Sequence, residues 1–381
     1  MGEWKECRLG DVAELVKEKY TPQKGDALNY IGLEHIQEQT LRLLEIGNSD
    51  DISSAKFYFK SGDILFGKLR PYFRKVVRPN FDGVCSTDIW VIRSKNDVLQ
   101  EYLFYLFACK ELVDLSNSGE AGTRMPRADW KFLSQSVWNI PIYETEQRAI
   151  ASILSSLDDK IDLLHRQNKT LEAMAETLFR QWFVEEADKR EVRQISDLVE
   201  FNPVRTLSKG TIASYLEMAN VNTDVFHPIE WYDREYNSGT KFINGDTLLA
   251  RITPCLENGK STYVTFLKEG QVGWGSTEFI VMRSENILHP LFSYILSKNT
   301  GFRDYAEGCL EGSSGRQRVN VDHLINFEIG IPDQSIIVLF NRILSGFEPK
   351  LQYNFKQIRT LEKLRDTLLP KLMSGEVRVE V

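Results

Sequence analysis

The chain has 381 residues, of which 42% are apolar and 27% charged, and its formal net charge is −7 at pH 7. This length predicts two or three domains with packed cores, and no apolar run approaches the roughly 18 residues needed to span a bilayer. The five cysteines are scattered without CxxC spacing, which indicates neither a zinc site nor a disulfide framework and fits a soluble, cytoplasmic protein. The negative charge disfavours a protein that binds nucleic acid alone, so such a role would need local basic patches or a partner.

A Gly-Asp stretch occurs twice. Residues 61–71 read SGDILFGKLRP and residues 244–254 read NGDTLLARITP. The first copy resembles a P-loop, which would indicate a nucleotide hydrolase, but Leu69 stands where a P-loop has the Ser or Thr that holds Mg²⁺. The second copy lacks the Gly-Lys pair altogether. What the copies share is a turn, a short apolar strand, a basic residue and a proline, so we expect a repeated structural turn.

Further segments recur in the same order, about 190 residues apart. The pairs are 9–15 with 195–201, 30–36 with 215–221, 85–94 with 275–284, 138–142 with 328–332, and 160–178 with 350–368. A period of half the chain indicates a tandem duplication of a whole unit rather than a solenoid.

Each copy combines a globular part with a long helix. Short strand-like runs, turn signals and interspersed helical segments predict an α+β domain at 1–143 and another at 185–331. Long helices are predicted at 144–184 and, with a C-terminal tail, at 332–381.

Both helical segments carry a stripe of residues that alternates by four and three positions, which is coiled-coil spacing. An Asn in each stripe could fix the register of a helix pair. The expected core is Leu157, Ile161, Leu164, Asn168, Leu171 and Leu178 in the first helix, and Phe347, Leu351, Asn354, Ile358, Leu361 and Leu368 in the second. We expect the two helices to pack as an antiparallel coiled coil in a pseudo-two-fold molecule; the alternative is that each helix covers only its own domain.

The first helix is long enough to act as a spacer on DNA. Leu157 to Trp182 is 26 residues, which gives roughly 39 Å of rod at about 1.5 Å per residue. One turn of B-DNA is about 34–36 Å. Two similar domains at the ends of such a rod could read a split target with a fixed unread gap.

Basic and hydroxyl-bearing loops recur at matched places in both copies. Arg and Gln can make paired hydrogen bonds to guanine and adenine edges, while Lys, Ser and Thr suit phosphates. Ordinary solvated loops are the alternative, which the recurrence makes less attractive. The candidate DNA-binding residues are Lys68, Arg70, Arg74, Lys75, Ser86, Thr87, Arg124 and Arg127 in the first copy, and Arg251, Lys260, Ser276, Thr277, Arg316, Gln317 and Arg318 in the second. The five histidines lack metal-ligand spacing, and no catalytic motif stands out, so neither a metal site nor an enzyme is predicted.

The helical segments 140–162, 169–183 and 360–377, with the Gly-Asp and Ser-Thr motifs, carry a resemblance to a known family. In these residues the chain resembles the specificity (S) subunit of a type I restriction-modification enzyme. One departure is IPDQSII at 331–337, where the first half reads ETEQRAIA, so docking of a partner at the second position could differ in detail.

The resemblance implies that each globular domain is a target-recognition domain for one half of a bipartite, asymmetric site in double-stranded DNA. It further implies that the helices dock two modification (M) subunits, which bring S-adenosylmethionine and adenine methylation. Restriction (R) subunits would bring ATP, Mg and translocation. The chain itself would be non-catalytic, without cofactor or membrane contact. The alternative is a coiled-coil adaptor that binds only proteins.

Overall fold

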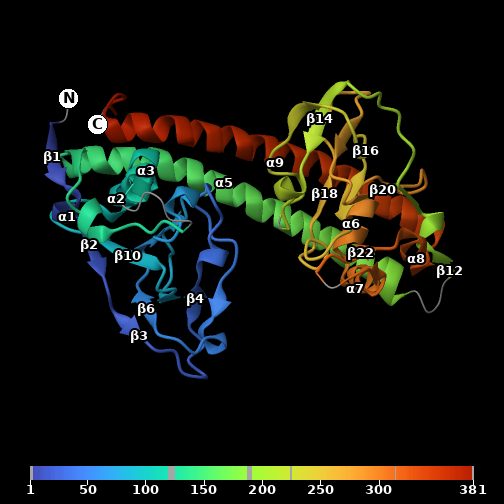
Figure 1. The fold of residues 1–381 in the computed structure, drawn as a ribbon, viewed down its shortest axis with the longest axis horizontal. Coiled ribbons are helices and arrows are strands. Elements are labelled where there is room, and N and C mark those ends of the chain that lie inside the picture. Colours follow the sequence, from blue (N-terminus) through green and yellow to red (C-terminus); the bar gives the residue numbers. More distant parts are fainter. Residues whose placement is uncertain (1–2, 119–124, 187–190, 224, 314, 380–381) are drawn as a thin grey trace. The chain divides into compact units, whose positions relative to one another are not determined.

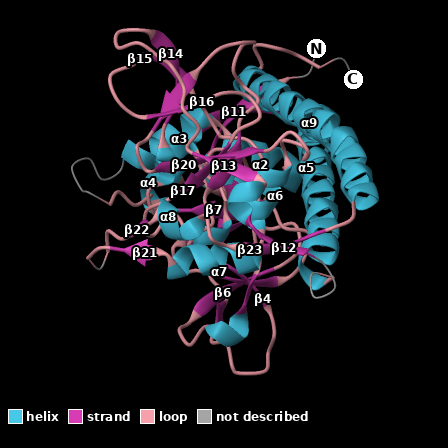
Figure 2. Cartoon of the chain, turned by 90° about the vertical axis from the view of Figure 1, so that its right-hand side faces the viewer, coloured by secondary structure: helices cyan, strands magenta, loops and turns pink. Residues whose placement is uncertain are grey.

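The computed structural model describes the chain except residues 1–2, 119–124, 187–190, 224, 314 and 380–381 (Figure 1). It divides into two compact units, and both boundaries fall inside long helices. Unit 1 comprises residues 1–163 and 358–381, and unit 2 comprises residues 164–357. Helices and strands are mixed in both units, which confirms the predicted α+β class (Figure 2).

Unit 1 is built from three sheets with helices packed against them. A four-stranded sheet has the order β2-β10-β7-β8, a five-stranded sheet the order β3-β6-β9-β4-β5, and β1 pairs with β11. All pairs are antiparallel except β4 with β9. The elements are β1 (Trp4–Arg8), α1 (Leu9–Val12), β2 (Ala13–Val16), β3 (Lys19–Tyr20), β4 (Asn29–Ile31), β5 (Gly47–Asn48), β6 (Lys56–Phe59), β7 (Ile64–Gly67), β8 (Val76–Val77), β9 (Gly83–Cys85), β10 (Ile89–Ser94), α2 (Gln100–Ala108), α3 (Lys110–Asn117), α4 (Trp130–Leu133) and β11 (Val137–Pro141).

Unit 2 repeats this plan. Its four-stranded sheets have the orders β13-β20-β17-β18 and β15-β14-β19-β16, and β12 pairs with β23. The first order matches β2-β10-β7-β8 strand for strand, which confirms the duplication. The elements are β12 (Glu191–Gln194), β13 (Val199–Phe201), β14 (Ile212–Leu216), β15 (Tyr232–Glu235), β16 (Thr240–Phe242), β17 (Thr247–Ala250), β18 (Ser261–Tyr263), β19 (Gly273–Gly275), β20 (Phe279–Ser284), α6 (Phe292–Lys298), α7 (Thr300–Gly308), β21 (Leu310–Glu311), β22 (Arg318–Val319), α8 (Val321–Leu324) and β23 (Glu328–Ile331).

The first Gly-Asp motif is a turn locked by a buried ion pair. Gly62 has φ +86°, a conformation that glycine adopts readily because it has no Cβ. The Asp63 carboxylate is almost fully buried, accepts the Lys60 N–H at 2.7 Å, and pairs with Arg93 Nε at 2.6 Å and Nη2 at 2.8 Å. Since Arg93 belongs to β10, this clamp joins the start of β7 to its neighbouring strand.

The second Gly-Asp motif repeats the clamp at the start of β17. Gly245 has φ +88°. Asp246, whose side chain is 0% exposed, accepts the Ile243 N–H at 2.8 Å and pairs with Arg283 of β20 at 2.6 Å. Arg205 lies 3.3 Å from the same carboxylate. The repeated Gly-Asp motifs, with Arg93 and Arg283, therefore serve the fold.

The nucleotide-hydrolase alternative finds no support in the backbone. Gly67 lies in β7, and its N–H donates to Lys75 O at 2.8 Å. The Lys68 N–H donates to Asp88 O at 2.9 Å. These N–H groups are used by the protein itself, whereas a P-loop aims them at phosphates.

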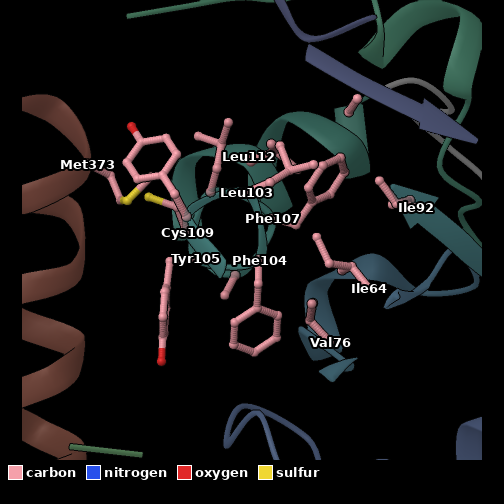
Figure 3. Packing of buried hydrophobic residues seen from close by; sticks show 14 of the residues in the cluster. Ile64, Val76, Ile92, Leu103, Phe104, Tyr105, Phe107, Cys109, Leu112 and Met373 are labelled. Carbon is pink, nitrogen blue, oxygen red and sulfur yellow. The ribbon is translucent and has the colours of Figure 1, made fainter. Parts of the chain in front are cut away.

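Each unit has one large apolar core that includes part of a long helix. In unit 1, the buried faces of α2 and α3 meet Ile64 and Ile92 on one side and Met373 on the other (Figure 3). In unit 2, the rings of Phe183 and Phe292 lie 5.2 Å apart, and Phe183 lies 5.2 Å from Phe340. Phe183 is the last residue of the segment 169–183, so the end of this segment anchors the first long helix in the core.

The two long helices contact each other within each unit. They are α5 (Glu144–Phe179), continued by a π-helix at Arg180–Glu185, and α9 (Gln334–Ser374). In unit 2, Asn354 Nδ2 donates to Asn168 Oδ1 at 2.8 Å, and the Trp182 and Phe340 rings lie 5.9 Å apart. Residue numbers rise along one helix as they fall along the other, which confirms the predicted antiparallel packing.

The helix contact in unit 1 is an ion pair rather than an amide pair. Arg365 is only 1% exposed, and its Nη1 donates to Asp158 Oδ1 at 2.9 Å and to Thr40 O at 3.0 Å. Burial raises the pKa of Asp158, and the Arg365 guanidinium opposes that rise. Every residue of the expected coiled-coil core is buried or half-buried.

We expect Asp246→Ala to destabilise unit 2 by about 1–3 kcal/mol, because it leaves the half-buried guanidinium groups of Arg205 and Arg283 without their partner. Hydrogen exchange of the β17 amides, followed with calorimetry, measures the loss. Asp304→Ala, at an exposed position of the same unit, is the control and should stay within about 0.5 kcal/mol of the parent. Equal protection of β17 in both variants would show that the clamp does not stabilise the strand.

A buried carboxyl predicts a pH-dependent stability. Burial raises the pKa of Glu348 above its ordinary value of 4.5, although hydrogen bonds from Tyr263 and Gln352 oppose the rise. Because the folded pKa is the higher one, this group stabilises the fold fully only below its unfolded pKa, and that contribution is lost as pH rises through the folded pKa.

Glu348→Gln should therefore raise the melting temperature at pH 7 and change it little at pH 4. The amide keeps an acceptor for Tyr263, and burial lowers the pKa of the neighbouring His289, so no ion pair is lost at neutral pH. Melting curves at both pH values test this, with the exposed Glu269→Gln as control. A variant less stable at pH 7 would contradict it.

Candidate nucleic-acid interface

In unit 1, the basic residues gather where β7 ends. The Lys68 N–H donates to Asp88 O at 2.9 Å, and Lys68 O accepts the Ala128 N–H at 2.8 Å. Leu69 also forms an isolated bridge with Arg127. The end of β7, the turn before β10 and the segment before α4 are therefore held together by backbone hydrogen bonds.

Unit 2 repeats this arrangement where β17 ends. The Arg251 N–H donates to Glu278 O at 2.9 Å, and Arg251 O accepts the Val319 N–H at 2.8 Å. Ile252 forms the matching bridge with Arg318. Lys68 thus corresponds to Arg251, and Arg127 to Arg318.

The Ser-Thr motifs form the turn that leads into β10 and β20. Ser86 Oγ accepts the Asp88 N–H at 3.3 Å, and Ser276 Oγ accepts the Glu278 N–H at 3.2 Å. Such local bonds are typical of serine at turns. The serines shape the backbone, while the threonines that follow, Thr87 and Thr277, are exposed.

In both units the exposed arginine is paired with an acid from that turn. Arg127 Nη2 lies 3.4 Å from Asp88, with 55% of the arginine side chain exposed. Arg318 makes a two-pronged pair with Glu278, at 2.7 Å from Nη2 and 2.9 Å from Nε. These bonds raise the pKa of the Arg318 guanidinium. Exposed pairs of this kind contribute only about 0–1 kcal/mol, so DNA phosphates or bases can compete for the arginines.

A cleft lies beside each arginine. The unit 1 cleft has a volume of about 440 Å³ and the unit 2 cleft about 530 Å³. Their polar and aromatic lining includes Lys17, Phe57, Lys68, Trp90, Arg127, Asp129, Trp130 and Lys131 in unit 1, and Arg251, Glu311, Arg318, Asn320 and Asp322 in unit 2.

The prediction that Arg74 contacts DNA is wrong. Arg74 is 8% exposed, and its Nε donates to Ala108 O at 2.7 Å while Nη1 pairs with Asp366 of α9 at 3.1 Å. The guanidinium joins the end of α2 to α9 and is not available to a nucleic acid.

Lys75 and Lys260, also predicted to bind DNA, are half-buried and donate to backbone carbonyl groups of neighbouring turns. Lys75 Nζ donates to Leu33 O at 2.8 Å, and Lys260 Nζ donates to Met218 O at 3.2 Å. Both acceptors begin matched 3₁₀ turns, Leu33–His35 and Met218–Asn220. These half-buried ammonium groups tie those turns to the sheets.

The remaining predicted residues differ in accessibility. Arg316 is exposed, whereas Arg70 and Gln317 are half-buried. The Gln317 N–H donates to Thr253 Oγ1 at 3.2 Å, which fixes this residue beside the end of β17. Arg124 lies outside the described residues.

Within the described part of the chain, no group of three or more His, Cys, Asp or Glu side chains is arranged to hold a metal ion. No helix among those residues is long and apolar enough to cross a membrane.

Comparisons with known proteins show similarity to one family. The family model described as "Type I restriction modification DNA specificity domain" matches residues 1–173. The HindI specificity subunit of Haemophilus influenzae is 25% identical, over 99% of this chain and 100% of the relative. The MjaIX specificity subunit of Methanocaldococcus jannaschii is 29% identical, over 75% of this chain and 71% of the relative. The crystal structure of an S subunit from M. genitalium has a similar fold, with a TM-score of 0.55 at 14% identity over 98% of this chain and 96% of that one.

The duplicated fold carries two clefts at equivalent positions, each beside an exposed arginine. The chain is similar to the specificity subunits of type I restriction enzymes, in agreement with the resemblance seen in its sequence.

We expect Arg127→Glu and Arg318→Glu each to weaken specific DNA binding roughly tenfold or more, because reversal removes a contact and adds repulsion toward phosphate. Fluorescence anisotropy of the partner-loaded chain at two salt concentrations measures this. Lys24→Glu and Lys268→Glu reverse exposed charges that do not line the clefts and serve as controls. Unchanged affinity in both arginine variants would remove these clefts from the DNA interface.

Proposed function

We propose that this chain is the non-catalytic subunit that reads a bipartite, asymmetric DNA target and directs partner adenine methyltransferase and restriction subunits to it. The observation that carries the proposal is the pair of clefts. Each cleft is framed by the same pattern of backbone hydrogen bonds, but the two clefts are lined by different side chains. Two such clefts suit two half-sites of unlike sequence, one read by each globular part.

The contacts proposed for each half follow from exposure and charge. The exposed Arg127 and Arg318 can exchange their half-buried acidic partners for base edges or phosphates. Thr87 and Thr277 are exposed in the turns that supply those acids, and their hydroxyl groups suit phosphate oxygens.

A repeated solvent-facing stretch on the helices supports two docking positions for one kind of partner. In unit 2, a groove of about 670 Å³ runs along α5, and Met174 at its centre is 48% exposed. On α9 in unit 1, Leu364 is 43% exposed at the matching position. The stretches are Lys169, Thr170, Ala173, Met174, Thr177 and Leu178 on α5, and Arg359, Thr360, Lys363, Leu364, Thr367 and Leu368 on α9.

The matched stretches also agree in detail. Thr177 Oγ1 donates to Ala173 O at 2.8 Å, and Thr367 Oγ1 donates to Lys363 O at 2.7 Å. Exposed apolar patches commonly mark protein interfaces. Because the same surface is present twice, we propose that two modification subunits bind, one at each copy. S-adenosylmethionine, ATP and Mg would be held by the partner subunits, acting with this chain on DNA in the cytoplasm.

A protein-only adaptor explains less of the structure. That alternative accounts for the repeated helical surface, but it leaves the matched clefts without a role.

The proposal predicts separable defects when this chain is co-expressed with its modification subunits. Met174→Glu and Leu364→Glu should each remove one copy of the partner, because a charge enters an apolar contact. Native mass spectrometry counts the copies, and methylation of DNA by the purified complex reports function.

Exposed apolar positions off these stretches, Val204→Glu in unit 2 and Ile46→Glu in unit 1, are the matched controls. Full occupancy by two partner copies in both helix variants would contradict the docking surfaces. A complex that assembles but methylates no specific site would contradict the DNA-reading function.

A further inference from the structure

The two clefts have an equivalent backbone position that carries opposite charge in the two units. In unit 1, Asp129 caps α4 and its side chain accepts the Lys131 N–H at 2.9 Å. In unit 2, Asn320 caps α8 and its side chain accepts the Asp322 N–H at 3.0 Å. Lys131 and Asp322 are therefore the second residues of equivalent short helices, and each lines its cleft.

Both side chains are open to a ligand. Lys131 and Asp322 are exposed. In the part of the chain that the structure describes, neither the Lys131 ammonium nor the Asp322 carboxylate has a hydrogen-bond or ion-pair partner. The neighbouring arginines differ in this respect, because Arg127 and Arg318 each pair with an acid from the adjoining turn.

The other residues that line the two clefts also differ in charge between the units. The unit 1 cleft adds Lys17, Lys68 and the ring of Trp130 around Lys131. The unit 2 cleft instead adds Glu311, whose carboxylate accepts from Asn320 Nδ2 at 2.9 Å. Unit 1 thus presents mainly donors, whereas unit 2 presents acceptors next to its arginines.

These charges fit different base edges. Guanine presents two acceptors, O6 and N7, in the major groove, which suit a lysine or arginine donor. The exocyclic amino groups of cytosine and adenine are donors that suit a carboxylate. A carboxylate is repelled by phosphates, so an unpaired one in a DNA-binding cleft gains little from the backbone and much from a base amino group.

We propose that Lys131 and Asp322 are specificity-determining residues at equivalent positions of the two half-site readers. Lys131 donates to guanine acceptors in one half-site, and Asp322 accepts from the exocyclic amino group of a base in the other. This inference rests on the proposed function. The inference goes beyond the proposed function because it names the residues, Lys131 and Asp322, that make the two half-sites differ in sequence. Arg127 and Arg318 are the same in both units and so cannot by themselves make the half-sites different.

The test is selection of bound sequences from randomised DNA by the partner-loaded chain. The variants are Lys131→Asp and Asp322→Lys, with the milder Lys131→Gln and Asp322→Asn in case charge reversal prevents assembly. Lys24→Asp and Glu269→Lys make the same changes at exposed positions that do not line the clefts.

Each Lys131 variant should change base preference by at least about fivefold at one or two positions of a single half-site. Each Asp322 variant should do so only in the other half-site, with the gap between halves unchanged and the controls like the parent. The same consensus bound more weakly would overturn the inference, since it marks a phosphate contact. Unchanged selection, or changes in both halves from one variant, would overturn it too. Failure of the parent complex to select any split motif would instead contradict the proposed function on which the inference rests.

Discussion

The buried clamp between the Gly-Asp turn and the neighbouring strand is the constraint on which both recognition surfaces depend. Asp63 with Arg93, and Asp246 with Arg283, fix the start of β7 and β17 against the central strand of each sheet. The far ends of those same strands carry Lys68 and Arg251 to the clefts. Because Asp63 and Asp246 are buried, loss of the paired arginine weakens the compensation of a buried charge, so the clamp resists change. The side chains at the cleft face solvent and can differ between units at little cost to folding.

Buried polar side chains also lie between the two long helices. Asn354 is fully buried and bonds Asn168, yet among the described residues its Oδ1 has no hydrogen-bond partner. Arg365 is buried among carboxylates at a position where the other helix has Ala175. Buried polar groups of this kind reduce stability but specify register in helix pairs. The two long helices thus have different contacts in the two units, although the stripe that they share is repeated.

Much of this architecture could be predicted from the sequence because the duplication provides an internal comparison. The Gly-Asp and Ser-Thr motifs marked the strands correctly, since turns need particular residues, and the heptad stripe predicted the helix pair. Comparing the two copies of the sequence did not show which charged side chains are exposed and which are buried. Arg74, Lys75 and Lys260 read as basic-patch residues, but tertiary contacts with α9 and with the 3₁₀ turns use their charges. The clefts could not be predicted from the sequence either, because Lys17, Trp90 and Trp130 come together only after three separate segments fold.

The central claim is that this chain determines which DNA sequence is modified, and methylome sequencing tests it most directly. Cells would express the modification subunits with this chain, with the Arg127→Glu and Arg318→Glu variants, or without it. The account predicts a split motif of methylated adenines with a fixed gap only when the chain is present, and its loss in the arginine variants. Methylation of the same motif without the chain, or none with all subunits assembled, would contradict the account.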